Sequence, residues 1–442
     1  MELPGYVLEL MQKLNGAGFQ AWVVGGCVRD SLLCKTPQDW DLCTDAKPEE
    51  MLSIFADFRL LTQGLKHGTI TVLSDSPVEI TTFRTEGGYA DHRHPGWVAF
   101  VPDIRLDLAR RDFTVNAMAY CPALGFADPF GGQQDLQSKL LRAVGEPETR
   151  FQEDGLRILR GARFCAAYDL TPEHATYEAM RSQRQLLDGL SRERVYSELC
   201  KFLLAAKVED LERFAPILTQ VLPELAPTVG FLQQNPHHVF DVYGHTAHVV
   251  AVCPAELPLR WAALLHDVGK PQCFHVDEKG VGHFPGHAQV GAELAASILA
   301  RLRAPKAMTE QVATLVRYHS TCRQAKGKTV RRLLRKLGET TLRQLLALDK
   351  ADGWGKQPGE SREVSPEIRE FEEELERILA ESPCLTLRQL AINGHDLQAI
   401  GVLPGRAMGS FLAFLLEQVE VGAVENEKEA LLQIAKSRLK DA

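Results

Sequence analysis

The residues best suited to chemistry are two aspartates, Asp39 and Asp41, which stand one residue apart in the segment QDWDLCT. Side chains at positions i and i+2 of a strand face the same way, so an extended segment would hold both carboxylates together. Such close like charges repel each other unless a cation lies between them. Hard divalent cations such as Mg2+ are held by one or two carboxylates together with substrate phosphates. The pair therefore predicts a magnesium site beside a bound phosphate.

A double glycine, Gly25-Gly26, precedes the acidic pair and follows the apolar run 21–24. The run predicts a short buried strand, and two glycines allow a backbone to approach a ligand closely. Arg29 and Asp30 follow on an expected helix. A Gly-Gly pair alone is commonly an ordinary turn, and an Asp-x-Asp pair alone is commonly a solvated strand end. Their order and spacing favour a glycine turn that binds a triphosphate beside the metal.

Composition narrows the class of protein. The 442 residues predict about three domains, and 45% hydrophobic with 24% charged residues is ordinary for a soluble globular chain. No apolar run reaches the roughly 20 residues that cross a bilayer, and the N-terminus lacks the basic segment of a signal peptide. Ten cysteines without CxxC pairs indicate a reducing compartment. We therefore expect a cytoplasmic protein with no membrane partner.

The net charge of −8 disfavours a nucleic-acid binder only weakly, because binding depends on a local patch rather than on the sum. The run 326–336 is rich in lysine and arginine and has almost no acid nearby. It is a candidate patch for a nucleic-acid backbone.

The elements that must position these groups follow from apolar spacing. A helix is expected over residues 2–20, and strands over 69–73 and 78–83. Glu79 lies on the second strand, where a single charge is ordinarily an exposed edge-strand residue. Residues 86–107 hold Gly, His, Arg and Pro with little periodicity, which predicts a mobile loop.

Residues 150–165 are expected to form one helix. Asp154, Arg157 and Arg160 then fall on one side of it, at i, i+3 and i+6. A carboxylate beside a guanidinium offers acceptors and donors side by side and can imitate a Watson–Crick edge. Composition alone favours an ordinary surface ion pair, worth about 0.3–0.5 kcal/mol.

A second group of candidates lies where most of the 14 histidines cluster. The apolar run 259–265 predicts a helix that ends at His266-Asp267. Adjacent histidine and aspartate side chains can both reach one metal only at a helix end or bend, and Gly269 supplies the break. Histidine and carboxylate ligands are typical of transition-metal sites, although a structural helical body with no metal is the alternative.

The order GG-x-x-RD followed by Asp-x-Asp resembles the signature of the nucleotidyltransferase superfamily related to DNA polymerase β. In detail it resembles the branch that holds the bacterial tRNA CCA-adding enzymes and the poly(A) polymerases. The segments VEITTFRTE, RRDFTVNA and EDGLR resemble further motifs of that branch, and the likeness spans nearly the whole chain.

The resemblance implies an α/β nucleotidyltransferase head, with a small mixed sheet and helices, followed by an all-α neck, HD body and tail. The implied domains are a catalytic head at 1–140, a neck that recognises the nucleotide at 141–205, a helical body containing an HD domain at 206–360, and a tRNA-binding tail at 361–442.

The same resemblance assigns site residues. Asp39 and Asp41 would hold two Mg2+ ions about 3.5–4 Å apart, with Glu79 as a third catalytic carboxylate. Asp154 and Arg157 would read the base, with Glu153 positioning Arg157. The segment ER-x-x-x-EL, which contains Arg194, either packs or assists the nucleotide pocket. The implied nucleotide-binding residues are Gly25, Gly26, Arg29, Arg111, Asp112, Asn116, Asp154, Arg157 and Arg160.

The activity implied is template-independent addition of C, C and A to the 3′ end of tRNA from CTP and ATP. The full length of the expected loop 86–107 implies that the final A is added. The alternative within the class is a poly(A) polymerase.

The histidine region resembles the HD phosphohydrolase superfamily, whose pattern is H…HD…D. The matching residues are His245, His266, Asp267 and a late aspartate, either Asp352 or, as the weaker match, Asp349. His287 and His319 stand where binuclear members place further ligands. A divalent transition metal there implies hydrolysis of phosphomonoesters or 2′,3′-cyclic phosphates. A further alternative makes this hydrolase the main activity and the head a vestigial RNA-binding module.

Overall fold

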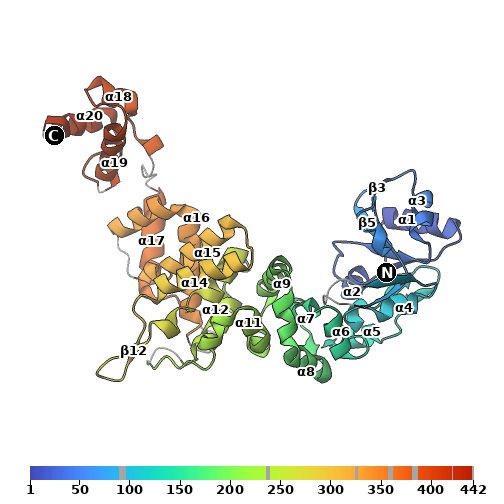
Figure 1. Ribbon diagram of the computed structural model, residues 1–442. Helices are drawn as coiled ribbons and strands as arrows, with labels where there is room; N and C mark the ends of the chain where they lie inside the picture. Colours follow the sequence, from blue (N-terminus) through green and yellow to red (C-terminus); the bar gives the residue numbers. More distant parts are fainter. Residues whose placement is uncertain are drawn as a thin grey trace. The chain divides into compact units, whose positions relative to one another are not determined.

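The structure is a computed structural model that describes residues 1–88, 96–234, 239–323, 327–356, 362–380, 387–420 and 422–440. Its contacts divide the chain into two compact units, Met1–Ala226 and Pro227–Ala442, which Figure 1 colours in sequence order. The first unit holds the expected head and neck together with the first residues of the expected body. The finer division into four domains stays a prediction.

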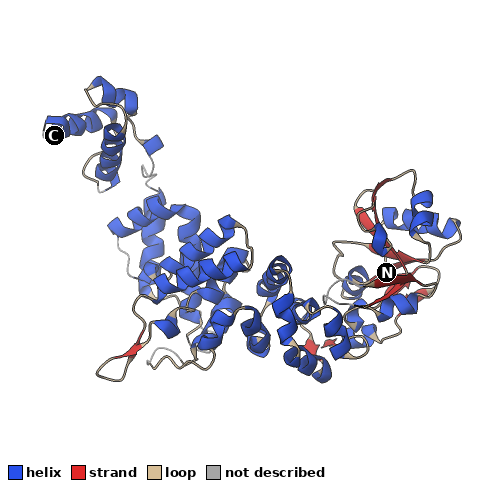
Figure 2. Ribbon diagram, in the orientation of Figure 1, coloured by secondary structure: helices blue, strands red, loops and turns tan. Residues whose placement is uncertain are grey.

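A seven-stranded mixed sheet organises the first part of this unit (Figure 2). Its strand order is β3-β4-β5-β2-β1-β8-β9. The only parallel neighbours in it are β2 and β5. The bounds are β1 Ala21–Val24, β2 Asp41–Thr44, β3 Arg59–Leu61, β4 Thr69–Leu73, β5 Pro77–Thr82, β8 Ala119–Cys121 and β9 Gly125–Ala127. The small mixed sheet that the sequence predicted is therefore confirmed.

Strand β1 is buried along its whole length because both faces of the sheet are covered. Ala21 and Val23 pack in a core with α1 and α3, whereas Trp22 and Val24 pack in a second core that includes α4. This alternation is the two-residue period of a strand. The helices around the sheet are α1 Gly5–Gly16, α2 Gly26–Leu32, α3 Pro48–Ile54, α4 Ile104–Ala109 and α5 Gly132–Gln137.

The prediction of a loop over residues 86–107 is wrong at both ends of that range. Strand β6 (Arg84–Gly87) pairs antiparallel with β7 (Trp97–Phe100), and the side chain of Asp103 caps α4 by accepting a hydrogen bond from the Arg105 amide at 2.9 Å. Each strand is only four residues long, too short for a clear alternation in the sequence. Residues 89–95 lie outside the described part of the chain.

The rest of the first unit is helical. The single helix expected over 150–165 is wrong, because Asp154 takes an extended conformation (φ −142°, ψ 105°) that ends α6. Its Oδ1 accepts a hydrogen bond at 3.0 Å from the amide of Leu156, the first residue of α7. The bounds are α6 Pro147–Glu153, α7 Leu156–Tyr168, α8 His174–Ser182, α9 Arg192–Ala205, α10 Val208–Arg213 and α11 Ala215–Val221, and β10 Leu140–Leu141 pairs with β11 Thr171–Pro172.

The second unit confirms the helical body that was expected. Helix α16 contains a kink at Gly338, whose φ of 78° lies in the left-handed region. The last three helices share their own apolar core. The bounds are α12 Val242–Val252, α13 Leu257–Leu265, α14 His287–Arg301, α15 Lys306–Tyr318, α16 Gly327–Trp354, α17 Pro366–Ala380, α18 Gly394–Ala399, α19 Arg406–Glu420 and α20 Lys428–Lys440, with the two-residue strands β12 His275–Val276 and β13 Gly282–His283. Lys326, the first residue of the basic run, lies outside the described part.

Across the described ranges, no helix is both long enough and apolar enough to cross a bilayer.

Candidate active site

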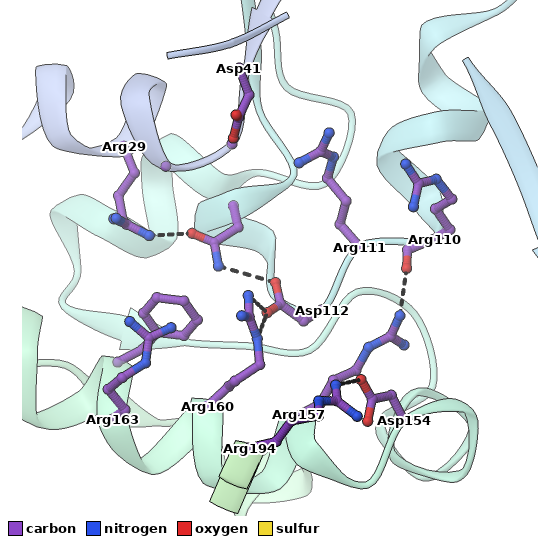
Figure 3. Close-up of a pocket in the computed structure, with 14 residues that line it drawn as sticks. Arg29, Asp41, Arg110, Arg111, Asp112, Asp154, Arg157, Arg160, Arg163 and Arg194 are labelled. Carbon is purple, nitrogen blue, oxygen red and sulfur yellow. Dashed lines mark hydrogen bonds and ion pairs between the residues drawn. The ribbon is translucent and has the colours of Figure 1, made fainter. Parts of the chain in front are cut away.

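A cavity of about 410 Å³ in the first unit collects residues from distant segments of the chain (Figure 3). Seven arginines and three aspartates line it, and this excess of positive charge favours an anionic ligand. All nine residues predicted to bind nucleotide line this one cavity, namely Gly25, Gly26, Arg29, Arg111, Asp112, Asn116, Asp154, Arg157 and Arg160.

Three further lining residues were missed: Arg110, Arg163 and Phe164. Arg163 stands three residues after Arg160 on α7, so the helical spacing could have found it. Its Nε lies 2.7 Å from Glu198 Oε2, an ion pair that joins α7 to α9.

The acidic pair lies where β2 begins. The strand starts at Asp41 rather than at Asp39, but Trp40 between them is buried, and both aspartates line one cavity as expected. Glu79 of β5 is the Cα partner of Asp41 in the parallel pairing. Burial and then the charge of Glu79 raise the pKa of Asp41 to about 6.

Carboxylates crowded in this way fit a divalent cation, because carboxylate oxygens are the ligands that Mg2+ prefers and their mutual repulsion falls once a cation binds. The residues that would hold Mg2+ are therefore Asp39 and Asp41, with Glu79 beside them.

The glycine turn lies next to the acidic pair. Gly25 has a φ of 80°, and a Cβ built at this position would lie 2.9 Å from Arg111 Nη1. Any side chain here would be strained by the backbone and would also displace the guanidinium. The turn therefore brings bare backbone and Arg111 to the same wall of the cavity.

Arg29 is held in one orientation although it faces the cavity. Its Nη1 donates to Asn116 Oδ1 at 2.5 Å and its Nε donates to Asp30 Oδ1 at 2.9 Å. Its guanidinium also lies 4.0 Å from the centroid of the Tyr168 ring. A fixed guanidinium binds phosphate with little loss of side-chain entropy.

Asp112 continues this network into α7. It accepts hydrogen bonds from Asn116 Nδ2 at 3.1 Å and from Arg160 Nε at 2.8 Å. Burial raises the pKa of Asp112, but Arg160, Asn116 and Arg157 outweigh it and hold that pKa well below its usual range. The carboxylate is therefore ionised, and the chain of contacts from Arg29 to Arg160 forms one wall of the cavity (Figure 3).

Asp154 and Arg157 lie on the opposite side of the cavity from Asp41 (Figure 3). The contact expected between Glu153 and Arg157 is present, with Arg157 Nη1 donating to Glu153 Oε2 at 2.6 Å. Arg157 Nη2 donates to the Arg110 carbonyl at 2.9 Å, and Asp154 Oδ2 accepts from Arg194 Nη2 at 2.8 Å. Both side chains are thus fixed before any ligand binds.

A second cluster lies in the second unit, around Asp267. His266 Nε2 is 3.1 Å from Asp267 Oδ2 and 3.3 Å from His245 Nε2. On the other side, His287 Nε2 is 3.6 Å from Asp267 Oδ1 and 3.1 Å from His319 Nε2. Four histidines and Asp267 form two groups of three residues able to hold a metal, and Asp267 belongs to both.

The histidine rings are oriented by the backbone. The Nδ1 atoms of His245, His266, His287 and His319 lie 2.5–3.0 Å from the carbonyls of Gly355, Ala263, Phe284 and Val316. A neutral ring that donates from Nδ1 turns an unprotonated Nε2 toward the centre, which is the arrangement seen around bound metals. Burial lowers the pKa of His319 to about 4, so that this ring is neutral at pH 7. The donor set therefore fits a pair of divalent transition metals.

The two late aspartates differ in their surroundings. Asp352 Oδ1 lies 3.0 Å from His245 Nε2. Asp349 instead accepts hydrogen bonds from the amides of Ser320 at 2.6 Å and Cys322 at 3.0 Å. Both oxygens of Asp349 are thus used by the backbone, which favours Asp352 as the ligand.

Three segments of the chain match models of known protein families. Residues 21–142 match the family model described as "Poly A polymerase head domain". These residues therefore resemble the head domain of this family. Residues 169–228 match "Probable RNA and SrmB- binding site of polymerase A", and residues 286–435 match "tRNA nucleotidyltransferase domain 2 putative". The last range includes His287, His319 and Asp352 but begins after His266 and Asp267.

Two curated relatives are CCA-adding enzymes. The one from Streptococcus uberis is 48% identical over 209 residues, which cover 46% of this chain and 51% of that protein. The one from Streptococcus pyogenes serotype M3 is 48% identical over 199 residues, 45% of this chain and 49% of that protein. The chain thus matches about half the length of these relatives.

Solved structures match over a greater length. The Bacillus stearothermophilus CCA-adding enzyme in complex with CTP is 27% identical, has a TM-score of 0.72 and covers 100% of both chains. The Thermotoga maritima CCA-adding enzyme complexed with tRNA_CCA has a TM-score of 0.59 at 18% identity and covers 98% of this chain and 96% of that one. The chain therefore has the fold of CCA-adding enzymes, with a mixed-sheet head and a helical body.

Proposed function

We propose that this protein is a CCA-adding tRNA nucleotidyltransferase, which adds C, C and A to the 3′ end of tRNA from CTP and ATP. The observation that supports it best is the single cavity that joins Asp41 and the glycine turn to Asp154 and Arg157. A triphosphate and a base would contact these two ends. The names of the relatives agree with this proposal.

Different residues along the cavity bind different parts of the nucleotide. The turn at Gly25 and Gly26, with Arg29, binds the triphosphate, because backbone amides and a guanidinium are strong partners for phosphate oxygens. Asp112 and Asn116 face the ribose. The 3′-hydroxyl oxygen of the RNA bonds to the α-phosphorus as the bond to the pyrophosphate oxygen breaks, and the hydroxyl proton passes to solvent. Mg2+ held by Asp39 and Asp41 supplies activation of that hydroxyl and charge stabilisation of the pyrophosphate.

Asp154 and Arg157 account for the choice of base. Cytosine and adenine both present an exocyclic amino donor beside a ring-nitrogen acceptor on the Watson–Crick edge. A carboxylate accepts from the amino group and a guanidinium donates to the ring nitrogen. Uracil and guanine present a carbonyl acceptor beside a ring N–H donor. The carboxylate would then face an acceptor and the guanidinium would face a donor. Protein side chains can thus select C and A with no template strand.

The decisive experiment incubates a tRNA that lacks CCA with each nucleoside triphosphate alone and with CTP and ATP together. A CCA-adding enzyme incorporates two C residues with CTP and then one A when ATP is present. Long A tails with ATP alone would indicate a poly(A) polymerase instead.

The cluster around Asp267 supports a second activity, metal-dependent hydrolysis of phosphate or 2′,3′-cyclic phosphate ends. The support is the backbone orientation of four histidine rings toward one centre. A metal bound there supplies an activated water. Lys270, whose Nζ lies 2.6 Å from Asp267 Oδ2, adds positive charge for a phosphate ester.

This activity is tested by release of phosphate from 2′-phosphorylated or cyclic-phosphate RNA ends with Mn2+, Co2+ or Ni2+ added to the metal-depleted protein. Turnover with no nucleotide incorporation would favour the view that the head only binds RNA.

A further inference from the structure

A second cavity, of about 550 Å³, opens beside the first in the same unit. The two cavities share Gly26, Arg29, Asp41 and Arg163 as a common wall. Asp39 lines only the second, whereas Asp154 and Arg157 line only the first. The acidic pair therefore lies on the boundary, and the second cavity is the side away from the base-reading residues.

The second cavity carries its own positive charge. Lys35 and Lys201 are exposed residues that line it, and no ion pair of either ammonium group occurs within the described part of the chain. Asp30 also lines the cavity, but its carboxylate is already paired with Arg29 at 2.8 Å. The two lysines thus remain available to an anionic ligand.

An aromatic ring lies beside these cations. The ring centroid of Tyr168 is 4.7 Å from Lys35 Nζ, and Tyr168 lines the cavity with its side chain half-buried. The Arg29 guanidinium also lies over this ring, 4.0 Å from its centroid, so Tyr168 holds two cations at the wall of the cavity. Positive charge that can follow a phosphate backbone is a main feature of sites for single-stranded nucleic acid. The cavity volume lies within the range of about 300–1,000 Å³ that is typical of ligand pockets.

The proposed reaction also needs a binding site for its second substrate, the RNA that supplies the 3′-hydroxyl. In phosphoryl transfer the attacking and leaving oxygens lie roughly in line across the reacting phosphorus. With the base in the first cavity and the α-phosphate beside Asp41, the RNA hydroxyl has to reach the acidic pair without passing through the nucleotide. The second cavity contains both aspartates and leaves the first cavity free.

We propose that the second cavity binds the 3′-terminal nucleotide of the acceptor RNA, with Lys35 and Lys201 on its phosphodiester phosphates and its 3′-hydroxyl facing Asp39 and Asp41. This inference rests on the proposed nucleotidyltransferase function. It adds a binding site for the RNA end and names two positioning lysines.

The test compares the wild type with Lys35→Ala, Lys201→Ala and the double variant, using tRNA that lacks only the terminal A. The KM for this tRNA should rise about 10-fold or more in the double variant, and the salt dependence of tRNA binding should fall by about one counterion for each lysine removed. The KM for ATP should stay within about twofold, because both lysines are outside the nucleotide cavity. The double Lys→Arg variant should restore tRNA binding, since it keeps both charges.

Lys13→Ala is the matched control, because Lys13 on α1 pairs with Asp57 and lines neither cavity. A rise in the KM for ATP with an unchanged KM for tRNA would overturn the proposal and assign the cavity to the triphosphate or pyrophosphate. Unchanged KM values for both substrates would also overturn it. A wild-type protein that incorporates no nucleotide into any RNA would instead refute the underlying function, and this result needs no variant.

Discussion

Asp41 and Glu79 are Cα partners in the parallel pairing of β2 with β5. Burial, together with the charge of Glu79, raises the pKa of Asp41 to about 6. The ionised form of Asp41 is therefore unfavourable in the protein alone and becomes favourable when a cation binds. This relationship connects the stability of the head with its proposed metal site.

The first prediction concerns Asp41→Asn in the absence of divalent metal. A raised carboxyl pKa means that the group stabilises the fold below its unfolded pKa, near 3.8, and that this stability is lost as the pH rises through about 6. At pH 8 in EDTA, Asp41→Asn should therefore be more stable than the wild type by about 3 kcal/mol. The gain should vanish near pH 4.

Thermal or urea unfolding across this pH range measures the effect, with Asp75→Asn as the control because Asp75 is an exposed turn residue. An Asp41→Asn protein that is no more stable than the wild type at pH 8 would contradict the proposed repulsion between Asp41 and Glu79.

The second prediction concerns Arg194, which donates to Asp154 at 2.8 Å. Arg194→Ala removes a hydrogen bond that orients Asp154 and leaves the one from the Leu156 amide, so the kcat/KM for CTP and ATP should fall about 10–100-fold, the cost of one charge-assisted hydrogen bond. The relative incorporation of UTP and GTP should rise.

Arg181→Ala is the matched control, since Arg181 forms an exposed pair with Glu178 and lines neither cavity, and exposed pairs contribute about 0–1 kcal/mol. Unchanged selectivity in Arg194→Ala would show that Asp154 needs no support from α9.

The third prediction concerns Arg160, whose removal leaves the buried carboxylate of Asp112 short of its main partner. Arg160→Leu should destabilise the first unit by about 3 kcal/mol and weaken CTP binding. The double variant Arg160→Leu with Asp112→Asn should recover much of the stability but not the affinity. Denaturant unfolding and equilibrium CTP binding separate these two effects, and an Arg160→Leu protein as stable as the wild type would contradict the burial argument.

The fourth prediction separates the two late aspartates. Asp352→Asn and His245→Ala should lower the metal content of protein reconstituted with Mn2+, Co2+ or Ni2+, and should abolish phosphate release. Asp349→Asn should keep the metal, because Asp349 accepts from backbone amides. Elemental analysis is the measurement, and CCA addition should remain intact in all three. If Asp349→Asn lost its metal and Asp352→Asn kept it, Asp349 rather than Asp352 would be the ligand.

Local sequence patterns predicted the parts of the site that one segment builds. The strand before Gly25, the glycine turn and the acidic pair depend on neighbours in the chain, and β1 has the predicted bounds, Ala21–Val24. The break at Asp154 was missed because apolar residues continue across it at helical spacing, while the hydrogen bond from the Leu156 amide to the Asp154 side chain stabilises the extended conformation.

Residues that meet only through packing could not be predicted. Lys35 and Lys201 come from segments far apart in the sequence, and nothing local to either one predicts that both line one cavity with Tyr168. The orientation of the histidine rings likewise depends on backbone carbonyls, which a sequence does not locate.

The most direct test of the proposed mechanism is Asp39→Ala, assayed for CTP binding and for incorporation into tRNA lacking CCA. The variant should bind CTP with near wild-type affinity, because Asp39 does not line the nucleotide cavity, and it should incorporate no nucleotide. An Asp39→Ala enzyme that still adds C to tRNA would contradict the role of the acidic pair and the mechanism built on it.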